Sequence, residues 1–167
     1  MCQNQPPPAA LVPMEQADVP ALFALTSDPR VAAYMRFQTH TSFQQAQALY
    51  EEYTNYGSAG FCIVLANGKK AGFCALKPDE QTPDTCTVSL FLSPDYWNCG
   101  IATWVTEQLK IEAQRRGFSR MVAYVVEQNI GSRRVLEKCG FTAKEILHFH
   151  DLDSALYRFE RLLETTP

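Results

Sequence analysis

The stretch from Thr85 to Val126 constrains the fold of this chain more than any other segment. It begins with an apolar run of strand length, Thr85–Leu92, in which alternate residues are apolar. After a turn, the segment Ile101–Arg116 carries apolar residues four positions apart, the spacing of an amphipathic helix, and the apolar run Met121–Val126 follows. A strand, a helix and a strand in this order predict a right-handed parallel crossover in one sheet.

Further strand-length segments lie on both sides of this unit. Gly60–Leu65 and Ala71–Leu76 flank Asn67-Gly68, which is typical of a tight hairpin turn. Further elements are expected as a strand at 10–13, helices at 18–27, 30–37 and 42–53, and strands at 141–150 and 155–163. The order predicts an α/β (α+β) fold with a mixed sheet and helices on both faces. We expect a flexible arm at 1–9 and a single domain at 10–167.

Composition excludes several classes of function. The chain has 167 residues and a net charge of −3, which gives no basic face for nucleic acid. It has no apolar run of about 18 residues, so no membrane span is expected. The N-terminus lacks the basic and apolar regions of a signal peptide, and the six cysteines lack metal-ligand spacing. These features predict a cytoplasmic protein with reduced cysteines and no metal site.

Two segments join a predicted strand to the start of a helix. A helix start presents unpaired N–H groups and a positive dipole end, which suit a diphosphate. In the first segment, Gly100 and Ala102 are small enough for close approach of a phosphate, and Asn98 tolerates a positive φ. In the second, Asn129 and Ser132 lie where side chains cap a helix. The alternatives are a simple turn in the first segment and capping alone in the second.

The two segments together resemble the GNAT acetyltransferase superfamily. Tyr96–Ala102 is similar to its acetyl-CoA pyrophosphate loop, and Asn129–Phe141 is similar to the motif that follows. Asp28-Pro29 and Thr41-Ser42 resemble the branch of the RimJ/RimL ribosomal-protein N-acetyltransferases. The resemblance implies the acyl-CoA N-acyltransferase fold. That fold has a mostly antiparallel sheet of six to seven strands, with a central parallel pair that splays apart.

The resemblance also implies which residues bind acetyl-CoA. The backbone of Phe91, Leu92 and Ser93 would pair with the pantetheine arm, and the loop from Asn98 to Thr103 would hold the pyrophosphate. Asn129 would bond the pantetheine, and Ser132 would lie near the thioester sulfur. The implied binding residues are Phe91, Leu92, Ser93, Trp97, Asn98, Cys99, Gly100, Ile101, Ala102, Thr103, Asn129, Ser132 and Arg133.

The catalytic groups are less well defined, because the chain departs from the family pattern twice. Thr87 stands where many members carry a glutamate base, and Leu136 stands where many carry a tyrosine acid. Ser132 is then the remaining candidate for protonating the thiolate. The candidates for relaying a proton from the amine are Tyr124, Glu127, His148, His150 and Asp151.

The resemblance thus implies an N-acetyltransferase with acetyl-CoA as cosubstrate. The acetyl group would pass directly, in a ternary complex, to a protein N-terminal α-amine or a small-molecule amine. We expect a monomer or a homodimer. Because Thr87 and Leu136 replace the glutamate base and the tyrosine acid of many members, the alternative function is a non-catalytic acyl-CoA sensor or scaffold module. A doubly wound nucleotide-binding domain is disfavoured, because the chain has neither G-x-G-x-x-G nor G-x-x-x-x-G-K.

Overall fold

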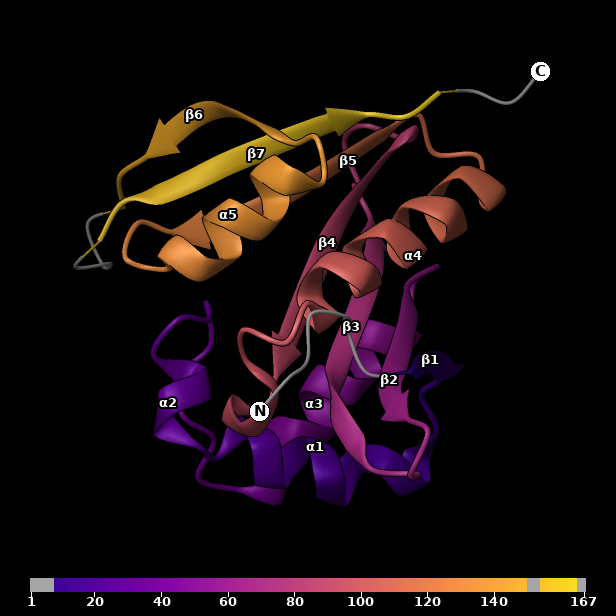
Figure 1. Ribbon diagram of the computed structural model, residues 1–167, viewed down its shortest axis with the longest axis vertical. Helices are drawn as coiled ribbons and strands as arrows, with labels where there is room; N and C mark the ends of the chain where they lie inside the picture. The colour runs from indigo at the N-terminus through magenta and orange to yellow at the C-terminus, as the bar shows by residue number, and fades with distance from the viewer. Residues whose placement is uncertain (1–7, 150–153, 165–167) are drawn as a thin grey trace.

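The structure, a computed structural model, describes residues 8–149 and 154–164. Its centre is one seven-stranded sheet in the order β1-β2-β3-β4-β5-β7-β6 (Figure 1). The strands are β1 (Ala9–Pro13), β2 (Ala59–Leu65), β3 (Lys70–Pro78), β4 (Thr85–Leu92), β5 (Arg120–Val126), β6 (Thr142–Leu147) and β7 (Leu156–Leu162). The helices are α1 (Val19–Thr26), α2 (Pro29–Ala32), α3 (Phe43–Thr54), α4 (Ile101–Arg115) and α5 (Ile130–Lys138).

Strand direction confirms the predicted architecture. Neighbouring strands run antiparallel except β4 and β5, which lie in the middle of the sheet and run parallel. Helix α4 connects these two strands, so the predicted parallel crossover is present. The fold is therefore a mixed, mostly antiparallel sheet with helices on both faces, as expected.

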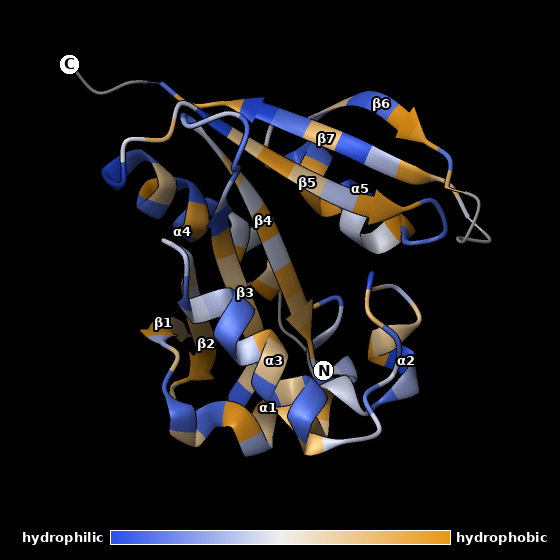
Figure 2. Cartoon of the chain, turned by 180° about the vertical axis from the view of Figure 1, so that it is seen from behind, coloured by the Kyte–Doolittle hydropathy of each residue, from blue (hydrophilic) through white to orange (hydrophobic). Residues whose placement is uncertain are grey.

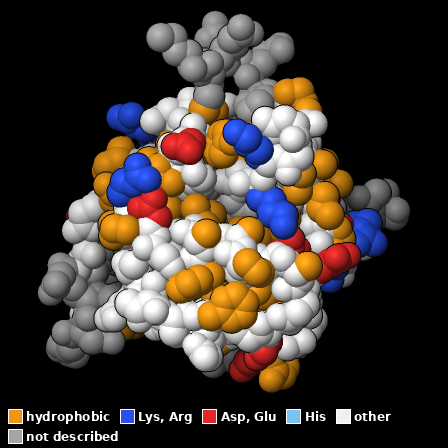
Figure 3. Space-filling model, turned by 90° about the horizontal axis from the view of Figure 1, so that it is seen from below, with side chains coloured by type: hydrophobic (Ala, Val, Ile, Leu, Met, Phe, Trp, Pro, Cys, Tyr) orange, Lys and Arg blue, Asp and Glu red, His pale blue; other side chains and the backbone are white. Residues whose placement is uncertain are grey.

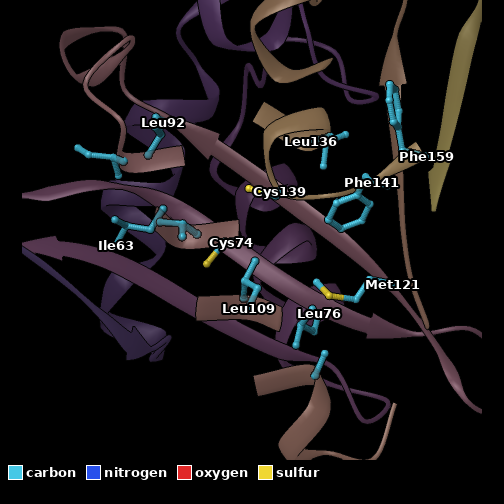
Figure 4. Close-up of a cluster of buried hydrophobic side chains, with 14 of the residues drawn as sticks. Ile63, Cys74, Leu76, Leu92, Leu109, Met121, Leu136, Cys139, Phe141 and Phe159 are labelled. Atoms are coloured by element: carbon cyan, nitrogen blue, oxygen red, sulfur yellow. The ribbon is translucent and has the colours of Figure 1, made fainter. Parts of the chain in front are cut away.

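Two apolar cores lie on opposite faces of the sheet. Helices α4 and α5 cover one face, and α1 and α3 cover the other (Figures 1 and 2). Side chains alternate between the faces along a strand, so Leu92 joins the core under α4 while Phe91 joins the core under α1 and α3. Figure 4 shows Leu109 of α4, Leu76 of β3 and Met121 of β5 in the first of these cores.

Two local signals in the sequence produce the expected turns and caps. The β2–β3 hairpin turns at Asn67-Gly68, and Gly68 has a φ of 80°, which glycine adopts without steric cost. The side chain of Ser42 accepts from the third residue of α3, and Gln45 bonds back to the Ser42 N–H, which is a capping box.

The predicted helix at 30–37 is wrong in length. Helix α2 ends at Ala32, and the Asp28 side chain caps its start by accepting from the Arg30 N–H at 2.9 Å. Beyond α2 the chain places the Phe37 ring against Phe91, with 5.6 Å between the ring centroids. Tertiary packing of this aromatic pair therefore overrides the local helical pattern.

The ends of two other elements also differ from expectation. Strand β1 begins at Ala9, inside the predicted arm, of which residues 1–7 lie outside the described part of the chain. Strand β6 ends at Leu147 rather than at 150. His150 and Asp151 lie outside the described residues.

The cysteines follow the prediction at four positions and depart from it at one. Cys62, Cys74, Cys86 and Cys139 are buried free thiols. Burial raises the pKa of the Cys86 thiol to about 12, so this group stays protonated. Cys99 is disulfide-bonded, so the expectation of a reduced thiol is wrong there.

Within residues 8–149 and 154–164, no helix is long and apolar enough to cross a membrane. The same residues hold no group of three or more His, Cys, Asp or Glu side chains placed to hold a metal ion.

Candidate active site

Strands β4 and β5 pair over only a short distance and then separate. Their parallel register covers Thr85 with Arg120, Cys86 with Met121, and Thr87 with Val122, while both strands continue to Leu92 and Val126. The last five residues of β4 therefore have β3 on one side and an open gap on the other. The predicted splay of this central pair is present.

Backbone bonds to β3 show which way each residue of β4 faces. The Asp79 N–H donates to the Thr85 carbonyl at 2.9 Å, and the Ser93 N–H donates to the Ala71 carbonyl at 2.8 Å. These bonds use odd-numbered residues of the β4 segment. Because backbone direction alternates along a strand, all the odd-numbered residues between them face β3 as well.

The even-numbered residues consequently direct their backbone groups into the gap. Val88 and Leu90 present both N–H and C=O there, and Leu92 presents its N–H. Phe91 and Ser93 are predicted to pair with a pantetheine arm, yet their backbone groups face β3. Of the three residues predicted to pair, Leu92 alone presents a backbone group to the gap, and the rest of the available edge lies earlier on β4, at Val88 and Leu90.

The start of α4 closes one end of the gap. Gly100, the N-cap residue, has a φ of 75° and supplies no capping side chain. Asn98 also has a positive φ, 58°, as the sequence predicts. The turn thus leaves the N–H groups at the start of α4, in residues Ile101 to Thr103, without a side-chain cap. Their dipole end suits an anion at this position.

Trp97 holds the loop against the end of β4. Its indole N–H donates to the Leu92 carbonyl oxygen at 3.0 Å, which occupies the last carbonyl of the strand. Its ring meets Tyr34 edge-on, with 6.4 Å between centroids, so the loop is also tied to the segment after α2. Trp97 also lines the cleft, so these contacts fix the position of a residue that is predicted to bind the ligand.

The second predicted segment lies across the gap. Asn129 caps α5, because its side-chain oxygen accepts from the Ser132 N–H at 3.1 Å. Its amide NH2 group remains as a donor. Ser132 is half-buried and lines the same cleft as Asn129. Capping and ligand contact are therefore compatible roles for Asn129.

A single cleft of about 930 Å³ joins these features. It runs from the α4 start along the β4–β5 gap to the face of the sheet that α3 covers. On that face it is lined by polar side chains that no sequence motif singles out. These are Arg36, Glu52, Lys77 and Ser89.

Tyr53 of α3 reaches β4 at this end of the cleft. It is 2% exposed, and its hydroxyl is hydrogen-bonded to the Ser89 hydroxyl. Burial raises the pKa of the Tyr53 hydroxyl, so the group stays neutral at physiological pH. The pair offers a hydroxyl network rather than an ionised base.

Three of the predicted site residues, Ser93, Glu127 and Arg133, do not line the cleft. The Arg133 guanidinium stacks on the Tyr157 ring, 4.3 Å from its centroid, and donates to the Glu127 carbonyl at 3.3 Å. Glu127 is exposed, and its own N–H donates to Ala155. The next residue along α5, Arg134, lines the cleft instead.

Apart from His148, the other described candidate residues are brought together in the cleft. Tyr124 lines the cleft from β5, under the Arg36 guanidinium at 5.5 Å from its ring centroid. Thr87, in the position of the missing glutamate, is half-buried in the same wall, and His148 is exposed away from it. The predicted binding residues that line the cleft are Phe91, Leu92, Trp97, Asn98, Cys99, Gly100, Ile101, Ala102, Thr103, Asn129 and Ser132.

Comparison with known proteins identifies the class. Residues 10–142 match the acetyltransferase (GNAT) domain family. No curated protein matches the chain at the level of sequence. The fold is shared with a spermidine N-acetyltransferase from Vibrio cholerae in complex with CoA and spermine. That match has a TM-score of 0.81 and 16% identity, over 92% of this chain and 95% of the other.

Two further solved structures are similar. One is a GCN5-related N-acetyltransferase from Kribbella flavida, with a TM-score of 0.79 and 18% identity over 93% of this chain and 98% of that one. The other is a GNAT-family acetyltransferase from Bacillus anthracis, with a TM-score of 0.79 and 19% identity over 95% and 96% of the two chains. The chain belongs to the GNAT acetyltransferase family.

Proposed function

We propose that this protein transfers the acetyl group of acetyl-CoA to a primary amine by direct attack in a ternary complex. The observation that carries the proposal is the continuity of one cleft. The uncapped start of α4, the open edge of β4 and the polar face under α3 all lie along it. These three parts suit a diphosphate, an amide-bearing arm and an acceptor, in that order.

The placement of acetyl-CoA follows from the free backbone groups. The diphosphate would accept from the N–H groups at the start of α4. The pantetheine amides would pair with Val88 and Leu90, in the way that an added strand would. The arm then leads the thioester toward Asn129 and Ser132. Vibrio cholerae spermidine N-acetyltransferase, which has the same fold, is solved with CoA, which supports CoA as the ligand.

The reaction needs a neutral amine at the thioester carbon. The amine loses a proton, its nitrogen forms a bond to the carbonyl carbon, and the tetrahedral oxyanion is stabilised by N–H groups such as that of Leu92. The nitrogen then releases a second proton, and the C–S bond breaks as the carbonyl re-forms. The thiolate takes a proton from Ser132, which regains one from water. Tyr124, which lines the cleft, would pass the amine protons onward. An α-amine, with a pKa near 8, needs less help than a lysine.

The Ser132→Ala variant tests the role of this hydroxyl. We expect kcat to fall about tenfold to a hundredfold, since a positioned proton donor contributes about that much or more. The KM for acetyl-CoA should stay within about twofold. The Asn129 side chain accepts from the backbone N–H of residue 132, and alanine keeps that N–H, so Asn129 stays in position. Ser119→Ala, just before the start of β5 and outside the cleft, is the matched control. An unchanged kcat in Ser132→Ala would contradict this role and would mean that water alone protonates the CoA thiolate.

A thiol-release assay tests the function itself. The protein is mixed with acetyl-CoA and a panel of N-terminal peptides and small amines, and free CoA is measured together with direct CoA binding. Amine-dependent thiol release supports an enzyme, and preference for peptides supports the RimJ/RimL branch. CoA binding without thiol release for any acceptor would contradict the proposal and favour a sensor or scaffold.

A further inference from the structure

The charged side chains lining the cleft are mostly basic. Among the described residues that line it, Arg36, Lys77, Arg134 and Lys138 are basic, and Glu52 alone is acidic. Figure 3 shows basic and acidic side chains interspersed on the molecular surface seen from below, so no field of one sign covers that face. The basic excess of the cleft lining is therefore not shared by that face.

The basic residues divide between the two ends of the cleft. Arg134 and Lys138 belong to α5, which packs on the same side of the sheet as α4, where the phosphates would bind. Lys77 lies in β3 opposite Thr87, next to Tyr53, on the face covered by α3. Arg36 lies over Tyr124. The acceptor end therefore has two cations of its own.

The single acid at this end is already paired. Glu52 forms an ion pair with Lys77, and the Lys77 ammonium also lies 6.0 Å from the Tyr53 ring centroid. The two side chains are 52% and 30% exposed. The Lys77 and Glu52 charges thus offset each other, and Glu52 is already engaged rather than free to bind a second ammonium group.

Arg36 has no such partner. No carboxylate among the described residues forms an ion pair with it. Its guanidinium is held over the Tyr124 ring by a cation–π contact, which leaves the edge of the planar fork open. A guanidinium fork matches a carboxylate with two parallel hydrogen bonds.

We infer that the acceptor is a primary amine that also carries a carboxylate. Arg36 binds this carboxylate, and Lys77 forms an ion pair with Glu52 that offsets the Glu52 charge. This rests on the proposed acetyl transfer and adds the acceptor class. It sets the chain apart from the Vibrio cholerae protein of the same fold, which is solved with the polyamine spermine. A polyamine would bring its second ammonium group to a cleft end where Arg36 is unpaired and the Glu52 carboxylate is already bound to Lys77.

Three amines of similar length test the inference. 4-Aminobutyrate, butylamine and putrescine carry a carboxylate, a methyl and an ammonium group at the far end. A second series uses Ala-Asp and Ala-Lys dipeptide amides. We expect kcat/KM to be about tenfold to a hundredfold higher for the acidic member of each series than for the basic one. This ratio corresponds to the free energy of one hydrogen-bonded pair of opposite charges.

Variants make the test sharper. In Arg36→Gln, kcat/KM for the acidic acceptors should fall by the same factor, while that for butylamine stays within about twofold. In Lys77→Gln, the exposed Glu52 carboxylate should raise the use of putrescine relative to 4-aminobutyrate. Glu52→Gln should shift the ratio the opposite way. Lys69→Gln, in the exposed hairpin turn, is the control and should not change the ratio.

The outcomes separate the two proposals. Thiol release with no charge preference, or with a preference for putrescine and Ala-Lys amide, overturns the carboxylate inference and leaves acetyl transfer standing. A preference for acids that survives in Arg36→Gln overturns the role of Arg36. The absence of thiol release with every acceptor overturns the proposed function and this inference with it.

Discussion

Ala102→Asp is expected to lower CoA affinity about a hundredfold while leaving the protein folded. Ala102 lies in the first turn of α4 and lines the cleft. A carboxylate there is favourable to the helix dipole, so the free energy of unfolding should hold or rise slightly. It would also lie within a few ångströms of the diphosphate. Like charges about 4 Å apart repel by up to about 4 kcal/mol at an effective dielectric of 20, which solvent reduces further.

The matched control is Ala102→Asn, which has nearly the same size and no charge. Isothermal titration with CoA measures both variants, and thermal denaturation confirms that both fold. We expect the asparagine variant to bind within about tenfold of the parent protein. Equal affinities for the two variants would mean that no phosphate lies near this turn.

Gly72→Ala is expected to destabilise the fold strongly, because β3 has no room for a methyl group at this position. A Cβ at position 72 would overlap the Phe91 carbonyl oxygen and lie 2.9 Å from the Leu92 Cα, so the β4 backbone itself must move. Overpacking of this kind costs about 3 kcal/mol. For a chain of this size the melting temperature should drop by about 6–12 °C. CoA affinity should fall too, because the displaced residues adjoin the open edge of β4.

Gly131→Ala supplies the comparison. Its φ is not positive, and a Cβ there would meet only the Asn129 side-chain oxygen at 3.9 Å. In a helix, alanine is favoured over glycine by up to about 1 kcal/mol, so the melting temperature should hold or rise. If Gly72→Ala melts at the parent temperature, the close approach of β3 and β4 is not as described.

The fold was accessible from the sequence where local signals agree with the tertiary structure. The crossover from Thr85 to Val126, the turn at Asn67-Gly68 and the positive φ of Asn98 are all encoded by short-range patterns, and all are present. The helix expected at 30–37 failed, because Phe37 packs on Phe91, more than fifty positions away. Local periodicity contains no information about such a contact.

The same limit applies to the candidate site. The loop residues were predicted because they share a motif. Which backbone atoms of β4 face the gap depends on the register between β4 and β3. A shift of one residue in that register would turn the odd-numbered residues toward the gap in place of the even-numbered ones. Arg133 and Arg134 are adjacent, and only helix phase decides which lines the cleft. Glu52 and Lys77 lie 25 positions apart in unrelated elements, so nothing in the sequence indicates that they pair.

The central claim is that the N–H groups at the start of α4 bind the diphosphate of coenzyme A. The most direct measurement is the ¹H–¹⁵N spectrum of the labelled protein, titrated with CoA and, separately, with pantetheine, which has no diphosphate. We predict that the amide resonances of Gly100, Ile101, Ala102 and Thr103 move with CoA and remain in place with pantetheine. Resonances that stay fixed when CoA binds would contradict the account.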